Sequence, residues 1–237
     1  MAPKEFVLVV VRHGQGTHNL PEGHPLRQVA WDEAGDLDTE LTAEGRHQAA
    51  LVGSRLQDTD FHLAISSHLR RTRDTAAAIL HHHTLELEEW RVVKERCFGS
   101  VLEASLPLII AQSTVEAAVA ERGLLTWRPP GRGGESVADV VARVKKFLLE
   151  VQARAVGLPQ ASPTVLVVSH YGFMAELHRE LTGSDKFRKL CNTGVDQYRI
   201  GVEVEGATVT RVQCTVELEG CGIHLEGCSP AETNQMG

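Results

Sequence analysis

The sequence lacks an apolar run long enough to cross a membrane among its 237 residues. Its first apolar run, residues 6–11, is also too short for the core of a signal peptide with its cleavage site. No Pro-, Ser- or Gly-rich linker divides the middle of the chain, and no internal repeat or low-complexity segment occurs. We therefore expect one globular domain over residues 1–227, followed by a polar, disordered tail over residues 228–237.

Cysteines are few, and basic residues are outnumbered by acidic ones. The five cysteines are odd in number and loosely spaced, which argues against a disulfide framework, and none has the Cys-x-x-Cys spacing of a zinc site. These absences favour a reduced, cytoplasmic setting. The net charge of −7 argues against a nucleic-acid-binding surface, and the missing apolar run argues against a membrane partner. A small phosphorylated partner needs only a local cluster of cations, and the sequence names no protein partner.

Strand patterns are present in the first half and near the end of the chain. Three continuous apolar runs, residues 6–11, 63–66 and 165–168, are typical of strands buried on both faces of a parallel sheet. Further on, the pattern alternates around a Glu-Gly pair, which predicts an antiparallel hairpin of residues 198–204 and 207–218.

Amphipathic stretches alternate with these strands. The pattern over residues 135–155 is the clearest, and Thr42 is placed to cap an earlier helix. This alternation predicts an α/β fold: a three-layer α/β/α sandwich with a mostly parallel central sheet and a C-terminal antiparallel hairpin. The predicted helices cover residues 42–57, 71–82, 106–125, 135–155 and 172–181.

Two histidines directly follow predicted buried strands. Arg12-His13-Gly14 comes after the first strand, and Ser169-His170 comes after residues 165–168. Ligand sites of open α/β sheets gather at the carboxyl ends of strands, and a flexible Gly14 would let a phosphate approach the backbone. One Arg-His-Gly is weak evidence, and a lone histidine at a strand end is more often structural. The repeated placement favours a functional pair.

A third strand end carries arginines. Residues 66–72, Ser-Ser-His-Leu-Arg-Arg-Thr, follow the strand at 63–66 and open a helix. A helix N-terminus attracts anions, and an arginine there binds phosphate oxygens in pairs. Arg70, Arg71 and Arg73 cannot all point inward, so some of them are surface charges.

Together these segments resemble the histidine phosphatase superfamily, which includes the cofactor-dependent phosphoglycerate mutases. The resemblance implies that His13 is the nucleophile, Arg71 the second functional arginine, Glu95 the acid and His170 the second catalytic histidine, with Asn19 six residues after the nucleophile. Five ordered segments are far more specific than any one of them. They are Arg12-His13-Gly14 with Asn19, residues 38–45, 66–75 and 94–99, and Val167-Val168-Ser169-His170.

Within the superfamily, the sequence looks most similar to the TIGAR-type fructose-2,6-bisphosphatases. The likeness implies a small substrate such as fructose 2,6-bisphosphate or a bisphosphoglycerate. It is carried by residues 94–99, by the Pro-Pro-Gly…Gly-Gly-Glu-Ser stretch at 129–136, and by Asn192-Thr193-Gly194 with the two strands that follow.

Two departures from the pattern bear on substrate choice. The position after the second histidine, usually glycine, is Tyr171, and Gly172 comes one place later. We expect both residues to contact substrate, with the tyrosine ring crowding the site. Arg132 is an extra cation, and with Arg70 and Arg96 it offers a subsite for a second anionic group of the substrate.

The chemistry that the resemblance implies needs no metal and no cofactor. Arg12, Arg71 and His170 would surround the phosphate oxygens, with Asn19 as a neutral contact. His13 would attack phosphorus and form a phosphohistidine.

In the same scheme Glu95 would protonate the leaving alkoxide and then activate water. Two alternatives stay open: a phosphoglycerate mutase, and a catalytically silent protein that binds a phosphorylated ligand. His81-His82-His83 suggests a metal site, but adjacent residues at a helix end point in different directions, so we interpret them as a solvated terminus.

Overall fold

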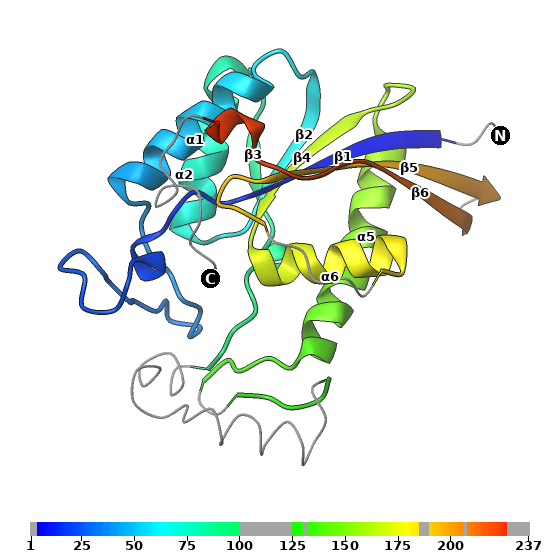
Figure 1. Cartoon of the computed structure of the whole chain (residues 1–237). Coiled ribbons are helices and arrows are strands. Elements are labelled where there is room, and N and C mark those ends of the chain that lie inside the picture. The colour runs from blue at the N-terminus through cyan, green and yellow to red at the C-terminus, as the bar shows by residue number, and fades with distance from the viewer. Residues whose placement is uncertain (1–3, 100–124, 130–131, 185–189, 206–207, 227–237) are drawn as a thin grey trace.

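The computed structural model describes residues 4–99, 125–129, 132–184, 190–205 and 208–226, which contain a six-stranded sheet (Figure 1). The strand order is β3-β2-β4-β1-β5-β6. Neighbours among the first four pair in parallel, whereas β5 pairs antiparallel with β1 and with β6. The strands are β1 (Lys4–Arg12), β2 (Phe61–Ser66), β3 (Leu87–Glu89), β4 (Thr164–Ser169), β5 (Val195–Glu205) and β6 (Thr208–Cys221).

Helices cover both faces of this sheet. Figure 1 shows α1 (Ala43–Leu56) and α2 (Arg70–Ile79) on one side of the sheet, and α5 (Val137–Gly157) and α6 (Tyr171–Thr182) on the other. The predicted α/β fold, with its mostly parallel sheet and C-terminal antiparallel hairpin, is confirmed.

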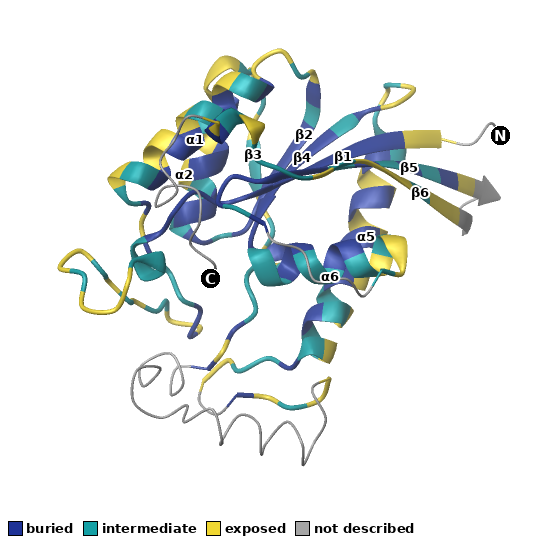
Figure 2. Cartoon of the chain, viewed as in Figure 1, coloured by how far each residue is buried: buried dark blue, intermediate teal, exposed yellow. Residues whose placement is uncertain are grey.

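The side chains of β1 alternate between two apolar cores. Even-numbered residues from Phe6 to Val10 pack in the cluster that contains Phe147 of α5. Odd-numbered residues from Val7 to Val11 pack in the cluster formed with α1 and α2. Figure 2 shows β1 and β4 buried over most of their length, with only the N-terminal end of β1 exposed. A strand that packs against an apolar layer on each face consists of a continuous run of apolar residues. For this reason the strand could be predicted from the sequence.

The four predicted helices that fall on described residues agree with the structure except at their ends. Thr42 caps α1 as expected, since its hydroxyl accepts from the backbone N–H of Gly45 at 2.9 Å. The helix predicted over residues 71–82 tightens after Ile79 into a 3-10 turn, Leu80–His82. Most of the helix predicted over residues 106–125, and the tail over 228–237, lie outside the described residues.

Helix α5 begins at Val137, two residues after the start of the stretch predicted over residues 135–155. Ser136 is the N-cap: its hydroxyl accepts from the backbone N–H of Asp139, whose carboxylate accepts from the Ser136 N–H in return. This reciprocal pair satisfies two free donors of the first turn. Glu135 instead accepts from the guanidinium of Arg143 at 2.7 and 3.0 Å.

The parallel strands bring distant segments to one edge of the sheet. Arg12 is in register with Ser169, and Ser66 is in register with Val168, so the residues that follow these strands emerge side by side. The loop after β1 packs tightly on α1, because a Cβ atom at Gly14 would overlap the carbonyl oxygen of Gly45. In the parts of the chain that are described, no helix has the length and apolar character needed to span a membrane.

Candidate active site

His13 lies at the end of β1, buried and with a fixed ring orientation. Its Nδ1 is 2.6 Å from the carbonyl oxygen of Gly14. A carbonyl oxygen only accepts, so Nδ1 carries the proton and Nε2 keeps its lone pair. Burial lowers the pKa of His13 well below its ordinary value, and the nearby Arg71 and Arg12 lower it further. The imidazole is therefore neutral, with a nucleophilic nitrogen at Nε2.

His170 follows β4 and faces His13, with 5.0 Å between the ring centroids. Arg71 Nη2 donates to His170 Nδ1 at 3.1 Å, and a guanidinium only donates, so the proton of the neutral ring lies on Nε2. That nitrogen donates to the hydroxyl of Ser67 at 2.9 Å. Burial, then the charge of Arg71, lowers the pKa of His170 well below its ordinary value.

Two arginines are buried beside these rings, with side chains 2% exposed for Arg12 and 1% for Arg71. Arg12 Nη1 donates to the carbonyl of Leu190 at 2.7 Å, while its Nε is buried with no partner among the described residues. Arg71 Nη1 donates to the carbonyl of Leu37 at 2.6 Å. Buried guanidinium groups are costly unless they are paired, so this geometry suits a bound anion.

Glu95 reaches the site from the segment after β3 and lies at the N-terminus of α6. Its Oε1 accepts from the backbone N–H groups of Gly172 at 3.0 Å and Arg96 at 2.7 Å. A Cβ atom at Gly172 would overlap this oxygen, so only glycine admits the carboxylate here. Gly172, one place later than the family pattern, therefore seats Glu95. The neighbouring Tyr171 places its ring under the guanidinium of Arg12, 5.7 Å from ring centroid to Cζ.

Asn19 and His18 form a hydrogen-bonded chain on the other side of His13. The backbone N–H of Gly16 donates to Asn19 Oδ1 at 3.0 Å, which directs the Asn19 amide nitrogen toward His18 Nε2, 3.0 Å away. Since that amide nitrogen only donates, the proton of His18 lies on Nδ1, which donates to the Thr39 hydroxyl at 2.7 Å. The ring of His18 is 5.9 Å from that of His13.

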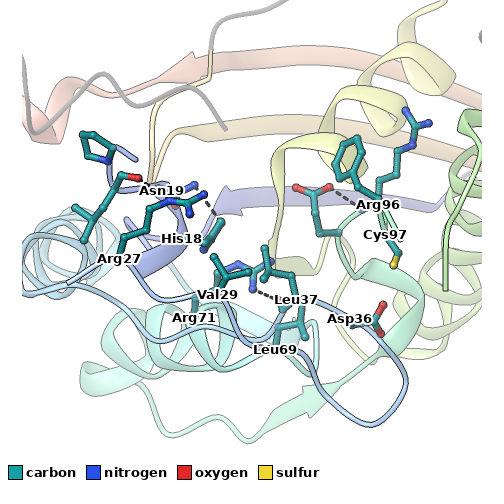
Figure 3. Close-up of a pocket in the computed structure, with 14 residues that line it drawn as sticks. His18, Asn19, Arg27, Val29, Asp36, Leu37, Leu69, Arg71, Arg96 and Cys97 are labelled. Atoms are coloured by element: carbon teal, nitrogen blue, oxygen red, sulfur yellow. Dashed lines mark hydrogen bonds between the residues drawn. The ribbon is translucent and has the colours of Figure 1, made fainter. Parts of the chain in front are cut away.

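Two connected cavities open on these groups. The larger, of about 440 Å³, is lined by Arg71 and by residues of the loop after Asn19, and Figure 3 shows His18, Asn19 and Arg27 across it from Arg96 and Cys97. The smaller, of about 310 Å³, contains His13, Arg12 and Tyr171. The residues common to both linings are His18, Asn19, Glu95, Arg96 and Phe98.

The structure brings together most of the predicted site residues. Arg12, His13, Asn19, Glu95, Arg71, Tyr171 and Gly172 line one cavity or both, and His170 lies next to His13 without lining either cavity. Gly14 lines neither of these cavities. Its N–H donates to the Thr75 hydroxyl at 3.0 Å and its carbonyl accepts from His13, so Gly14 positions the imidazole ring.

Of the three extra cations, only Arg96 lines the cavities. Arg70 pairs with Asp38 and with Glu40 at 2.7 Å instead. Arg132 packs against the backbone of Gly35, outside both linings.

Sequence reasoning missed three residues of the site: His18, Arg27 and Ser67. His18 and Ser67 lie inside recognised motifs, so their place in the motif was the available signal. Arg27 lies in a loop with no periodic pattern, and nothing in the sequence marks it.

One candidate metal group exists among the described residues, and it is made of Asp32, Asp36 and His68. Its charge is already balanced, because Lys94 and Arg91 pair with Asp36. Although burial raises the pKa of Asp36, the hydrogen bonds from His68 and Lys94 lower it to about 2. The group acts as an ion-pair network that supports the segment before Glu95. The histidines at 81–83 contribute to no such group in the described parts of the chain.

Comparison with known proteins gives the family. The sequence profile of the histidine phosphatase superfamily (branch 1) matches residues 8–215. The chain is 32% identical over 177 residues to a glucosyl-3-phosphoglycerate phosphatase of Mycobacterium tuberculosis, covering 73% of this chain and 74% of the relative. It is 30% identical to a 2,3-bisphosphoglycerate-dependent phosphoglycerate mutase of Gloeobacter violaceus, covering 74% and 75%.

Comparison with solved structures points to the same group of relatives. A mycobacterial glucosyl-3-phosphoglycerate phosphatase in complex with VO3 is 25% identical and superposes with a TM-score of 0.65, covering 92% of this chain and all of that one.

Proposed function

The chain belongs to the histidine phosphatase superfamily, and from that membership we propose that it is a phosphatase that hydrolyses small phosphorylated metabolites through a phosphohistidine on His13. Relatives named for phosphoglycerate substrates support the substrate class. The single observation that carries the reaction is the state of His13, a buried neutral ring whose Nδ1 is held by Gly14.

The first half-reaction is attack by His13 Nε2 on phosphorus, opposite the leaving oxygen. Arg12 and Arg71 neutralise the phosphate oxygens, and Asn19 adds an amide donor. A phosphate oxygen would replace His170 Nδ1 as the acceptor for Arg71 Nη2. As the phosphorus–oxygen bond breaks, protonated Glu95 gives its proton to the leaving alkoxide.

The second half-reaction regenerates the enzyme. The Glu95 carboxylate takes a proton from water, the resulting hydroxide attacks phosphorus, and the bond to His13 Nε2 breaks. Inorganic phosphate leaves, and His13 returns to its neutral state. Every charge that this scheme requires is supplied by side chains of the chain itself.

A phosphoglycerate mutase is the second candidate, and the similarity to a bisphosphoglycerate-dependent mutase favours it. A mutase would return the phosphoryl group from His13 to a hydroxyl of the bound product instead of to water. Measuring inorganic phosphate release and 2-phosphoglycerate formation from the same 3-phosphoglycerate sample separates the two activities.

The narrower substrate, fructose 2,6-bisphosphate, is part of the same proposal. The likeness of residues 94–99 and 129–136 to the TIGAR-type enzymes supports it. A panel of fructose 2,6-bisphosphate, 2,3-bisphosphoglycerate and 3-phosphoglycerate, compared by kcat/KM, decides among these anions.

The test of the mechanism is His13→Ala. We expect this variant to lose nearly all turnover, by roughly a thousandfold or more, because the covalent step has no other nucleophile. Mass spectrometry of wild-type samples quenched without acid should find one phosphate on His13. A variant that keeps substantial turnover with an intact thermal transition would defeat the proposal.

A further inference from the structure

Arg27 lines the larger cavity from the loop after Asn19, on the same wall as His18 (Figure 3). The side chain is part-buried, and its Nε donates to the carbonyl of Leu20 at 3.1 Å. That bond leaves both terminal amino groups of the guanidinium available to a ligand. The loop is stabilised from within as well, because the Thr17 hydroxyl donates to the carbonyl of Gln28 at 3.3 Å.

The charge of Arg27 is not balanced by an acidic side chain. In the described parts of the chain no carboxylate lies within 4.0 Å of its guanidinium, whereas Arg70 and Arg73 each have a glutamate partner. Its neighbours are cations and imidazoles: burial lowers the pKa of His18 most, and Arg71, Arg12 and Arg27 lower it further. A half-buried cation beside other cations is unfavourable in the absence of an anion.

Arg96, on the opposite wall, is in a different position. Its Nε donates to the carbonyl of Glu135 at 3.0 Å. Burial lowers the pKa of Arg96, and the charges of Glu135, Glu176 and Glu95 act in the opposite direction. Arg96 is therefore already surrounded by acidic groups. The phosphoryl group has Arg12 and Arg71, which leaves Arg27 as the cation of the larger cavity that is available to another part of the substrate.

We propose that Arg27 binds a carboxylate on the leaving group of the substrate and thereby selects phosphorylated acids over phosphorylated alcohols. The parallel N–H groups of one guanidinium match the two oxygens of one planar carboxylate. A second phosphate dianion would need two arginines, as the reacting phosphate has in Arg12 and Arg71. A cavity of about 440 Å³ has room for a small organic acid. This inference rests on the proposed phosphatase function and names its substrate subsite.

The experiment compares 3-phosphoglycerate with glycerol 3-phosphate, which differ only in the carboxylate. In the wild type we expect kcat/KM to favour the acid by roughly tenfold to a hundredfold, as for one charge-assisted hydrogen bond. Arg27→Gln should bring this ratio close to one, mainly through KM of the acid. Arg27→Lys keeps the positive charge but cannot donate two parallel hydrogen bonds, so its kcat/KM ratio should lie between those of the wild type and Arg27→Gln. Arg199→Gln, on β5 and outside both cavities, is the matched control and should leave the ratio unchanged.

Binding measured without turnover separates this inference from the proposed function. Calorimetry compares the binding of both ligands to His13→Ala and to the double variant His13→Ala, Arg27→Gln. Adding Arg27→Gln should weaken the affinity for 3-phosphoglycerate by the same factor as it lowers the kcat/KM ratio. The affinity for glycerol 3-phosphate should stay unchanged. If both ligands lose affinity equally, or the wild type prefers neither, the carboxylate subsite is wrong. If the acid binds through Arg27 but is never hydrolysed and His13 is never phosphorylated, the subsite stands and the phosphatase function falls.

Discussion

Three imidazoles, those of the buried His13 and His170 and of the half-buried His18, lie among guanidinium groups at the carboxyl end of the sheet. Burial lowers the pKa of each, and Arg71 adds to the lowering in all three. Each ring has one tautomer fixed by a neighbour that can only accept or only donate. At the residue scale, three neutral histidines therefore lie where we expect a phosphate dianion to bind.

These histidines make stability depend on pH. Their folded-state pKa values lie below the unfolded value near 6.5, so below pH 6.5 the unfolded chain binds protons that the folded chain does not. The free energy of unfolding is therefore independent of these groups above pH 6.5 and falls as pH decreases. Each histidine contributes a slope of up to about 1.4 kcal/mol per pH unit.

Urea unfolding between pH 7.5 and 5.5 measures this slope. We expect His18→Gln to reduce it by the share of one histidine, and the exposed His81→Gln to leave it unchanged. Asp36 does not interfere, because its pKa of about 2 places its own transition at lower pH. A free energy of unfolding that stays constant down to pH 5.5 in the wild type would contradict the buried, neutral state of the three rings.

At the scale of elements, the start of α6 holds Glu95, the proposed acid, in place. Tyr171 begins the helix, and the backbone N–H of Gly172 donates to Glu95, a residue 77 positions earlier. The positive end of the helix favours a carboxylate at this point. The helix therefore helps to fix the position of Glu95, the proposed acid, relative to His13, the proposed nucleophile, which comes from a separate segment.

Gly172→Ala tests this placement. The added Cβ atom would overlap Glu95 Oε1, so we expect the carboxylate to be displaced and turnover to fall by roughly tenfold to a hundredfold. The loss should be larger for an alkyl phosphate than for an aryl phosphate, whose leaving group needs little protonation. Gly157→Ala, where a Cβ meets nothing within 4 Å, is the control. Equal losses on both substrates would assign Gly172 a role unrelated to the acid.

The elements were predictable where one physical pattern dominates. Strands β1 and β4 are apolar on both faces, and α1 has a strong cap in Thr42, so their positions follow from sequence. Strand β3, Leu87–Glu89, was not predicted, because three residues at the sheet edge carry no periodicity. The start of α5 was predicted two residues early, since both Glu135 and Ser136 are polar and only the geometry shows that Ser136 caps the helix.

For the whole molecule, the candidate active site could be predicted where it depends on the order of the parallel strands. His13 and His170 follow neighbouring strands in register, so their convergence is a consequence of topology. Arg71 follows from the helix start after β2. The larger cavity could not be predicted, because one of its walls is the irregular loop after Asn19. Arg27 reaches the cavity only because of the path that this loop takes.

The last prediction concerns metal ions and also belongs to the whole molecule. In the proposed mechanism the phosphate meets Arg12 and Arg71, which are buried and hydrogen-bonded, and these would supply the positive charge that a divalent cation supplies in metal-dependent phosphatases. The acidic cluster at Asp32 and Asp36 is held by Lys94 and Arg91, so its carboxylates are engaged in ion pairs.

We therefore expect phosphatase activity to survive prolonged treatment with EDTA, with kcat/KM within about twofold of the untreated protein. The comparison is phosphate release before and after dialysis against EDTA, and again after adding Mg²⁺ or Zn²⁺, with a metal-dependent phosphatase treated in parallel to show that chelation was complete. Loss of activity that Mg²⁺ or Zn²⁺ restores would show that the arginines alone do not neutralise the phosphate. It would also direct attention to the histidines at 81–83 and to the cluster around Asp36 as sources of metal ligands.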